Sequence, residues 1–468
     1  MTATITPGPT VDPAAPLDRL RATFATGRTL PVDWREEQLA GLRRLLTEAE
    51  DELVEALRLD LGRPRAEAFA ADIGHAKVEI GHLAKHVAKW ARPRRAKVPW
   101  TIAPARAQVV PEPLGVALVM APWNYPIQLL LEPMAAALAA GNCVLGKPSE
   151  IAPACSAALG RLIPQYVDPD AVAVVEGGVA VATALLEQQW DHIFFTGSTA
   201  VGRIVAEAAA KHLTPSTLEL GGKSPTYVHA SADLGVAARR IAWGKFLNAG
   251  QTCIAPDYVL ADAQVRDDLV DRIVGEIGNF YGSDPKRSSS FGRIVNERHL
   301  DRLSGLLAHG AGTVVTGGEV DPAERYLAPT ITVDPDPSGP LMSEEIFGPI
   351  LPVIAVDGPD DAVRQIVSRP KPLALYVFAN DASVADDVLA RTSSGGSCVN
   401  HTLLHILPSD LPFGGVGASG WGAYHGKAGF DRFSHHRSVV RKPVKPDIRL
   451  LYPPYKKLTE RFMRRAFK

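Results

Sequence analysis

Short apolar runs alternate with amphipathic stretches in the first half of the chain. The amphipathic stretch 201–212 has helical spacing, whereas the apolar runs have the length of buried strands. Strands that alternate with helices predict a doubly wound parallel sheet, whose ligands bind at the carboxyl ends of the strands. We therefore expect site residues at the ends of the five apolar runs, which are Leu114–Ala121, Asn142–Lys147, Ala171–Glu176, Asp191–Thr196 and Ser216–Leu220.

The segment before this sheet predicts helices and an exposed strand. Leucines recur at helical spacing in Trp34–Leu61, and Gly62 and Pro64 end that pattern. A second amphipathic stretch covers Glu67–Ala91. The next residues, Val98–Val110, alternate and contain prolines, as an edge strand or arm does. We expect the helices to cover the outside of the sheet.

A second alternating region follows Lys223, and it predicts a second α/β domain. Near the end of the chain, Gly395–Ser397 and Pro412–Gly420 form a glycine-rich return segment. The expected elements of the second domain are helices Ala232–Asn248 and Gln264–Tyr281 and strands Tyr258–Ala261, Leu351–Val356 and Leu373–Phe378.

Composition excludes several classes of protein. The 468 residues suffice for roughly two or three domains. The 50 basic and 51 acidic residues give a net charge of -1, which argues against a nucleic-acid partner. The N-terminus lacks the pattern of a secretion signal, and no apolar window reaches the roughly 20 residues that cross a bilayer. We expect a cytoplasmic protein without a membrane span.

Four cysteines, Cys143, Cys155, Cys253 and Cys398, lie far apart in the sequence. They form no CxxC pair and have no histidines at zinc-ligand spacing, so we expect reduced thiols and no metal site.

Cys253 has the neighbours of a reactive thiol. It follows Gly250, Gln251 and Thr252, which are small or polar and permit close backbone approach. A cysteine attacks only as its thiolate, and a catalytic one needs an electropositive, partly open site. With Glu219 upstream, the pattern indicates covalent catalysis.

The strand ends carry further candidates, each with an ordinary alternative. Gly197–Gly202 opens a helix and could bind a phosphate, although Ser198 could equally be a helix cap. Lys147 ends an apolar strand, which favours a ligand partner over a solvated edge. Asn124 lies between prolines and could be a fixed amide donor or a turn residue. Glu219 could be a base or a strand-end residue that pairs with a lysine.

Together these segments resemble the aldehyde dehydrogenase superfamily over nearly the whole chain. The segments Tyr424–Lys427 and Tyr452–Tyr455 look most like its class 3 branch. The motifs that carry the resemblance are Ala121–Pro126, Gly146–Glu150, Phe195–Ser198, Leu218–Lys223, Gly250–Cys253, Glu344–Pro349 and Pro412–Gly417.

The resemblance implies NAD(P)-dependent oxidation of an aldehyde to a carboxylic acid. Cys253 would be the nucleophile that forms a thiohemiacetal and then a thioester. The Asn124 side-chain amide and the Cys253 backbone N–H would form the oxyanion hole, and Glu219 would activate the water that hydrolyses the thioester. Class 3 relatives imply a medium or long aliphatic or aromatic aldehyde as the substrate, and no metal.

The resemblance also implies the nucleotide contacts. Lys147 and Glu150 would meet the adenosine ribose, and Glu150 would repel a 2′-phosphate, so NAD is the first choice, with NADP possible. Phe413 and His425 fall near the substrate mouth and the dimer arm, and we favour a structural role for His425. The other cofactor-binding residues implied are Gly197, Ser198, Gly202, Leu220, Glu345 and Phe347.

The implied architecture is α/β: a Rossmann-like nucleotide-binding domain, a second α/β catalytic domain and a β-arm for oligomerisation, in a homodimer. Residues 446–468 form a basic tail, for which we favour a solvated state over contact with a membrane surface. The other ranges are 1–95 and 112–219 for the NAD(P)-binding domain, 220–415 for the catalytic domain, and 96–111 with 416–445 for the arm.

Three rival functions remain open at this point. An acylating dehydrogenase would pass the thioester to coenzyme A, but Glu219 favours water as the acceptor. A thiol hydrolase would pair Cys253 with a histidine and need no nucleotide, and none of the 13 histidines falls in a recognised protease pattern. A non-catalytic scaffold would not need the nucleophile, base and amide donor that this sequence holds.

Overall fold

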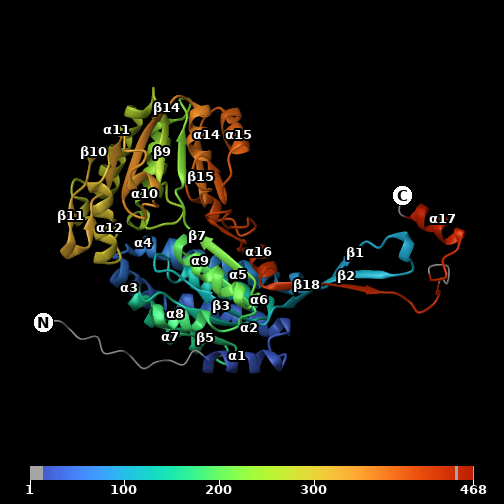
Figure 1. Ribbon diagram of the computed structural model, residues 1–468. Helices are drawn as coiled ribbons and strands as arrows, with labels where there is room; N and C mark the ends of the chain where they lie inside the picture. The colour runs from blue at the N-terminus through green and yellow to red at the C-terminus, as the bar shows by residue number, and fades with distance from the viewer. Residues whose placement is uncertain (1–13, 448–451, 467–468) are drawn as a thin grey trace.

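The computed structural model describes residues 14–447 and 452–466 and shows two α/β units and a projecting arm (Figure 1). The first unit has a six-stranded sheet in the order β17-β7-β6-β3-β4-β5, parallel except for β17 (Gly420–Trp421). All five predicted apolar runs form its parallel strands, which confirms the α/β fold. These strands are β3 (Val116–Met120), β4 (Cys143–Lys147), β5 (Val172–Val174), β6 (His192–Gly197) and β7 (Ser216–Leu220).

Helices cover both faces of this sheet. The expected helix Trp34–Leu61 is two helices, α2 (Val32–Glu48) and α3 (Glu50–Leu61), which meet at Ala49. The break goes with different packing partners, because α2 contacts α5 (His75–Trp90), α6 and α7, whereas α3 contacts α7, α4 and η1. The other helices of this unit are α1 (Ala14–Ala25), α4 (Arg65–Ala68), the π-helical turn η1 (Phe69–Gly74), α6 (Gln128–Ala140), α7 (Pro153–Tyr166), α8 (Val179–Leu186), α9 (Thr199–Lys211) and α16 (Gly426–Arg432).

The second unit has a seven-stranded sheet in the order β10-β13-β14-β9-β8-β15-β16, antiparallel only at β10. Its strands are β8 (Pro225–Val228), β9 (Tyr258–Asp262), β10 (Thr313–Thr316), β13 (Thr330–Val333), β14 (Ile350–Val356), β15 (Ala374–Phe378) and β16 (Gly396–Val399). The main helices are α10 (Leu234–Phe246), α11 (Arg266–Tyr281), α12 (Glu297–Ala308), α14 (Pro359–Val367) and α15 (Ala382–Arg391). The sequence did not predict β8, because four residues that follow Gly-Gly-Lys-Ser are too short for a periodic signal.

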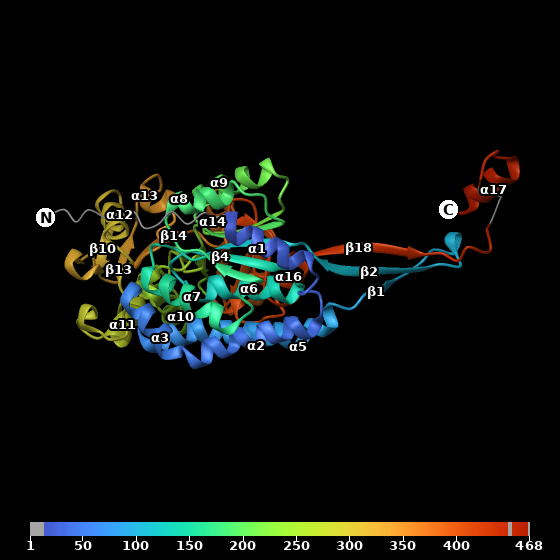
Figure 2. The same cartoon turned by 90° about the horizontal axis from the view of Figure 1, so that it is seen from below.

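The arm is a three-stranded antiparallel sheet of β1 (Arg94–Ala96), β2 (Arg106–Pro113) and β18 (Ser434–Arg441) that projects from the first unit (Figure 2). Strands β1 and β18 are largely exposed to solvent, and β2 between them is half-buried. Of the range 416–445, only the last part lies in the arm sheet, since β17 pairs with β7 and α16 packs against α5 and α6.

The basic tail forms α17 (Lys457–Ala466) near the tip of the arm, where Phe462 lies edge-on to Trp100. In the described part of the chain, every helix is too short or too polar to span a lipid bilayer.

Candidate active site

Cys253 is held by an unusual turn between the two units. After α10 ends at Phe246, three consecutive residues have positive φ: Asn248 (52°), Ala249 (52°) and Gly250 (76°). Gly250 is required here, because a Cβ would lie 2.2 Å from the carbonyl oxygen of Gly348. This turn places the half-buried Cys253 in the wall of a cavity.

The cavity has a volume of about 410 Å³ and an almost wholly apolar lining. The polar residues of its lining are Glu67, His75, Tyr125, Gln128, Thr252 and Cys253. A cavity of this size and character suits an organic substrate with an apolar body. The apolar lining includes Leu129, Trp243, Leu247, Ile254, Leu403, Leu404, Ile406, Leu407 and Phe413.

Asn124 lies beside the Asn248–Gly250 turn that precedes Cys253. It belongs to the segment after β3 and is buried. Its side-chain Nδ2 donates to the carbonyl oxygen of Gln251, two residues before Cys253, at 3.1 Å. An amide nitrogen carries two hydrogens, so one stays free for a second acceptor. Asn124 is thus a fixed amide donor rather than a turn residue exposed to water.

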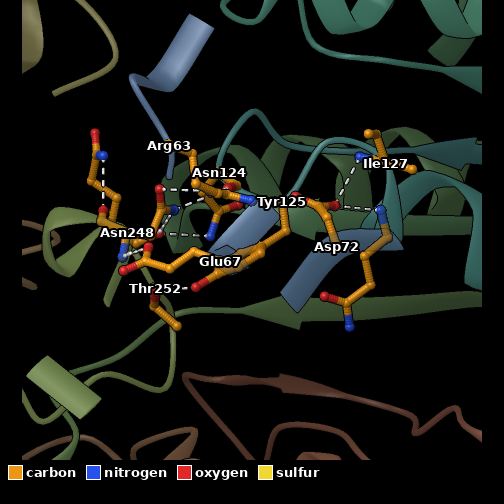
Figure 3. A network of polar contacts seen from close by, with 10 residues as sticks. Arg63, Glu67, Asp72, Asn124, Tyr125, Ile127, Asn248 and Thr252 are labelled. Atoms are coloured by element: carbon orange, nitrogen blue, oxygen red, sulfur yellow. Dashed lines mark hydrogen bonds and ion pairs between the residues drawn. The ribbon is translucent and has the colours of Figure 1, made fainter. Parts of the chain in front are cut away.

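A buried charge network fixes both Asn124 and the turn (Figure 3). Arg63, fully buried, forms an ion pair with Asp72 and donates to the Asn124 carbonyl oxygen. The same guanidinium donates to Oδ1 of Asn248 at 3.2 Å, and the Asn248 amide donates to the Asn124 carbonyl at 3.0 Å. The hydroxyl of Tyr125 lies 2.7 Å from that of Thr252. The oxyanion-hole candidate and the nucleophile turn are therefore joined by one network.

Replacing Arg63 with methionine should destabilise the protein by about 3–5 kcal/mol, because Asp72 would remain as an unpaired buried charge. Thermal or denaturant unfolding measures this loss. Arg58→Met is a matched control, since Arg58 forms an exposed pair with Glu55 on α3. Equal stability of the two variants would contradict the assigned role of Arg63.

Glu219 is a buried carboxylate on β7, opposite Thr196 of β6 and Gly420 of β17. Neither of its oxygens has a hydrogen-bond partner among the described residues, so it is not the lysine-paired strand end that the sequence left open. Burial raises the pKa of its carboxyl well above the usual value. Because the raised pKa results from burial, contact with water or a polar ligand would lower it and allow the carboxyl to ionise.

Cys253 has the carboxyl groups of Glu345 and Glu219 for neighbours rather than the electropositive surroundings that a reactive thiol needs. Burial, with the nearby charges of Glu345 and Glu219, raises the pKa of the Cys253 thiol to about 12. Burial and the charge of Asp257 raise the pKa of Glu345 to about 8. The thiol of this structure is therefore protonated at neutral pH, and it needs added positive charge or a base to react.

The predicted nucleotide residues lie at the carboxyl ends of β4, β6 and β7. The Nζ of Lys147 lies 2.7 Å from Oε2 of Glu150, so the cation pairs within its own turn instead of meeting solvent. Ser198 caps α9, with its hydroxyl accepting from Val201 N at 3.4 Å. A Cβ at Gly202 would lie 2.6 Å from Leu220, so this glycine lets α9 approach β7.

Glu345 and Phe347 lie on the opposite side, in the second unit. Gly221 leaves room for the Glu345 side chain, because a Cβ at Gly221 would lie 2.2 Å from one of its carboxylate oxygens. The other oxygen is buried without a hydrogen-bond partner among the described residues. Phe347 has a positive φ of 50° and packs edge-on to Trp123. Glu219 of the first unit and Glu345 of the second both lie near enough to Cys253 to act on the pKa of its thiol.

Comparison with known proteins decides the family. The Aldehyde dehydrogenase family model matches residues 8–439. The chain is 48% identical over 438 residues to aldehyde dehydrogenase family 3 member A2 of Mus musculus, covering 93% of this chain and 90% of that protein. This protein belongs to the aldehyde dehydrogenase family. It is an NAD(P)-dependent oxidoreductase of the class 3 branch, as its motifs predicted.

Two further relatives support this family membership. The dimeric NADP-preferring aldehyde dehydrogenase of Mus musculus is 46% identical over 440 residues, which cover 94% of this chain and 97% of that one. A Staphylococcus aureus AldH in a substrate-bound state superimposes with a TM-score of 0.95 at 40% identity, over 97% of this chain and 99% of that chain.

Sequence reasoning missed the supporting network of this aldehyde dehydrogenase. Arg63, Asp72, Asn248 and Glu67 were not singled out as site residues, although Arg63 stands between Gly62 and Pro64 at a helix break. The one signal available was Asp72, a charge on the same helical face as Ala68 and Ala76, which are buried. No group of three His, Cys, Asp or Glu in the described ranges has the arrangement of a metal site.

Proposed function

We propose that this aldehyde dehydrogenase oxidises medium or long aliphatic or aromatic aldehydes to carboxylic acids through a thioester on Cys253. One observation carries the proposal: Cys253 opens into a cavity of about 410 Å³ whose walls are apolar, beside the unpartnered carboxylate of Glu219. Burial of an apolar chain contributes roughly 0.8 kcal/mol per methylene group, so longer aldehydes should bind more tightly.

The chain's own residues account for the first bond. Once the Cys253 thiol has lost its proton, its sulfur attacks the aldehyde carbon, and negative charge develops on the aldehyde oxygen. The free hydrogen of the Asn124 amide and the Cys253 backbone N–H would stabilise that charge. The Arg63 network holds both groups in place before the substrate arrives, so little reorganisation is needed.

The residues at the carboxyl ends of β4, β6 and β7 suit a nicotinamide dinucleotide. The N-terminus of α9 with Ser198 would hold a pyrophosphate, and Lys147 and Glu150 would meet a ribose. The Glu345 oxygen that has no partner among the described residues would accept from a ribose hydroxyl. When bound, NAD(P) supplies the electron acceptor for the oxidation and a positive ring.

Glu219 is the proposed general base for the second half of the reaction. It would take a proton from the water that attacks the thioester carbon, which breaks the carbon–sulfur bond and releases the acid. Its raised pKa makes it a stronger base than an ordinary glutamate once it is ionised.

Asn124→Ala should lower kcat by about 10²–10³-fold, the usual cost of losing one oxyanion-hole donor. Steady-state kinetics with saturating nucleotide measure it. Asn279→Ala is a suitable control, because Asn279 lies on α11 away from the cavity lining. A loss confined to KM would contradict the assignment.

We infer a preference for NAD, with NADP accepted. The Glu150 carboxylate would repel a 2′-phosphate, although the name of the mouse dimeric relative records a preference for NADP. Comparing kcat/KM for NAD and NADP in the wild type and in Glu150→Gln tests this inference. Glu150→Gln should shift the ratio toward NADP.

We also propose a homodimer that forms through the arm strands β1, β2 and β18, with residues 1–95 and 112–219 as the NAD(P)-binding domain and 220–415 as the catalytic domain. The exposed arm strands and the dimeric relative support it. Sedimentation should give twice the chain mass.

For the basic tail, we propose a solvated state, so deletion of the residues after Tyr455 should leave binding to anionic liposomes unchanged.

The proposed function is tested by the growth of reduced-nucleotide absorbance with purified protein and a panel of aldehydes of graded length. Product analysis with and without coenzyme A separates hydrolysis from acyl transfer. Failure to bind nucleotide, measured by calorimetry, would favour the thiol hydrolase instead.

A further inference from the structure

His75 lies in the cavity wall with both ring nitrogens facing acceptors. Nδ1 lies 2.6 Å from Oε1 of the buried Glu132 on α6, and Nε2 lies 3.2 Å from the carbonyl oxygen of Ile406. The carboxylate and the carbonyl accept, so both nitrogens donate and the ring is an imidazolium. The Gln128 amide nitrogen, 3.0 Å from Nδ1, then donates to Oε2 of Glu132 at 3.4 Å and not to the ring. His75 is therefore a charged tie between the first unit and a segment of the second.

Glu132 holds a second histidine from the other side. Nε2 of His425 lies 3.3 Å from Oε2 of Glu132, and the His425 ring stacks on Phe413 with 5.4 Å between centroids. Phe413 lines the cavity, whereas Glu132 does not. The same buried carboxylate thus bonds to His75 and lies close to His425, which packs on the wall residue Phe413.

The segment that His75 ties down provides much of the apolar wall. Leu403, Leu404, Ile406 and Leu407 all line the cavity, and Leu403 has a positive φ of 64°. A leucine in this conformation is strained and needs outside contacts to stay there. The bond from His75 to the Ile406 carbonyl is such a contact, and it joins the wall to α5.

We propose that His75 is a specificity-determining positioning residue: its two N–H groups fix the 403–407 wall against Glu132 and so set which aldehyde tails fit the cavity. This inference rests on the proposed aldehyde oxidation. It assigns His75 no part in the chemistry at Cys253, since its ring nitrogens are both occupied.

The charges around His75 favour its protonated form. Burial lowers its pKa, but the charge and hydrogen bond of Glu132, the Ile406 carbonyl and the charge of Glu79 raise it to about 9. Burial of Glu132 is outweighed by His75 and His425, which lower the pKa of that carboxyl to about 2. Two further polar groups face the ring: Gln128 of α6, whose Nε2 lies 3.0 Å from Nδ1, and His425, whose ring centroid lies 5.6 Å away.

The first test is competition between a short and a long aldehyde, propanal and decanal, in one reaction. His75→Leu should lower the decanal/propanal ratio of kcat/KM by about tenfold, a typical effect of a displaced pocket wall on specificity. The matched control is His86→Leu, because His86 lies on the same helix and its ring bonds only to its own helix, at the His82 carbonyl. An unchanged ratio in a folded His75→Leu would overturn the proposal.

The second test needs no variant at position 75. Above about pH 9 the imidazolium of the wild type loses a proton and can keep only one tie, so the same ratio should fall. Titration of Cys253 or Glu219 affects both aldehydes alike and cancels in the ratio. Glu132→Gln should move the fall to lower pH, and a ratio independent of pH in both proteins would refute the role of His75. Oxidation of neither aldehyde by the wild type would instead reject the proposed function.

Discussion

Replacing Cys253 with alanine should abolish aldehyde oxidation, with kcat lower by on the order of 10⁴-fold or more, as expected when the nucleophile of a covalent mechanism is removed. The physical reason is that the cavity offers no second group at the same place: the remaining side chains around it are mainly aliphatic or aromatic. Spectrophotometric assay of reduced nucleotide with a saturating aldehyde measures the loss, and calorimetry should show unchanged nucleotide binding.

Cys398→Ala is the matched control for this experiment. Cys398 is also a half-buried thiol, and its sulfur lies 3.4 Å from Nδ1 of His405, which makes it the more obvious thiol and imidazole pair. If Cys398 were the nucleophile of a hydrolase, its loss would remove activity and that of Cys253 would not. We expect full oxidation in Cys398→Ala, and the reverse pattern would contradict the mechanism.

Glu219→Gln should stop turnover after the thioester has formed. Glutamine keeps the shape of the side chain but accepts no proton, so hydrolysis should slow by about 10²–10⁴-fold, the usual contribution of a general base. Mass spectrometry of the protein mixed with aldehyde and nucleotide should then show one acyl group on Cys253. Glu187→Gln, at the exposed end of α8, should turn over normally.

The pH dependence of this step follows from the pKa of Glu219. Burial raises that pKa, and only the ionised carboxylate accepts a proton, so hydrolysis should increase as the pH rises through the raised value. An ordinary glutamate would already be ionised well below neutral pH. The rising limb should disappear in Glu219→Gln, and a hydrolysis rate that is equal in both proteins at every pH would exclude Glu219 as the base.

The pattern of apolar runs predicted the sheet of the first unit. Five apolar runs became the parallel strands of the first sheet because burial on both faces of a parallel sheet demands continuous apolar residues, a local and readable signal. The break at Ala49 was not readable, because it depends on which helices α2 and α3 contact. The short β8 was missed because four residues carry no periodic signal, and only its pairing with β9 and β15 identifies it as a strand.

The candidate chemistry was readable as residue types in motifs, but its environment was not. No sequence pattern showed that the fold buries Cys253 and brings Glu345 and Glu219 near it, which together raise the pKa of the thiol. The sequence left Lys147 with two alternatives, a ligand partner or a solvated edge. In the structure it pairs instead with Glu150, three residues further along the chain.

By itself, the sequence determined the strand and helix periodicity and the family, and it nominated the reactive groups, because each of these signals is a short run of adjacent residues. Only the tertiary structure decided that Arg63 holds Asn124 and Asn248 together, and that His75, Glu132 and Ile406 meet beside the cavity. Such contacts join residues as many as 331 positions apart, and their energies depend on burial and exact distance, which no local pattern encodes.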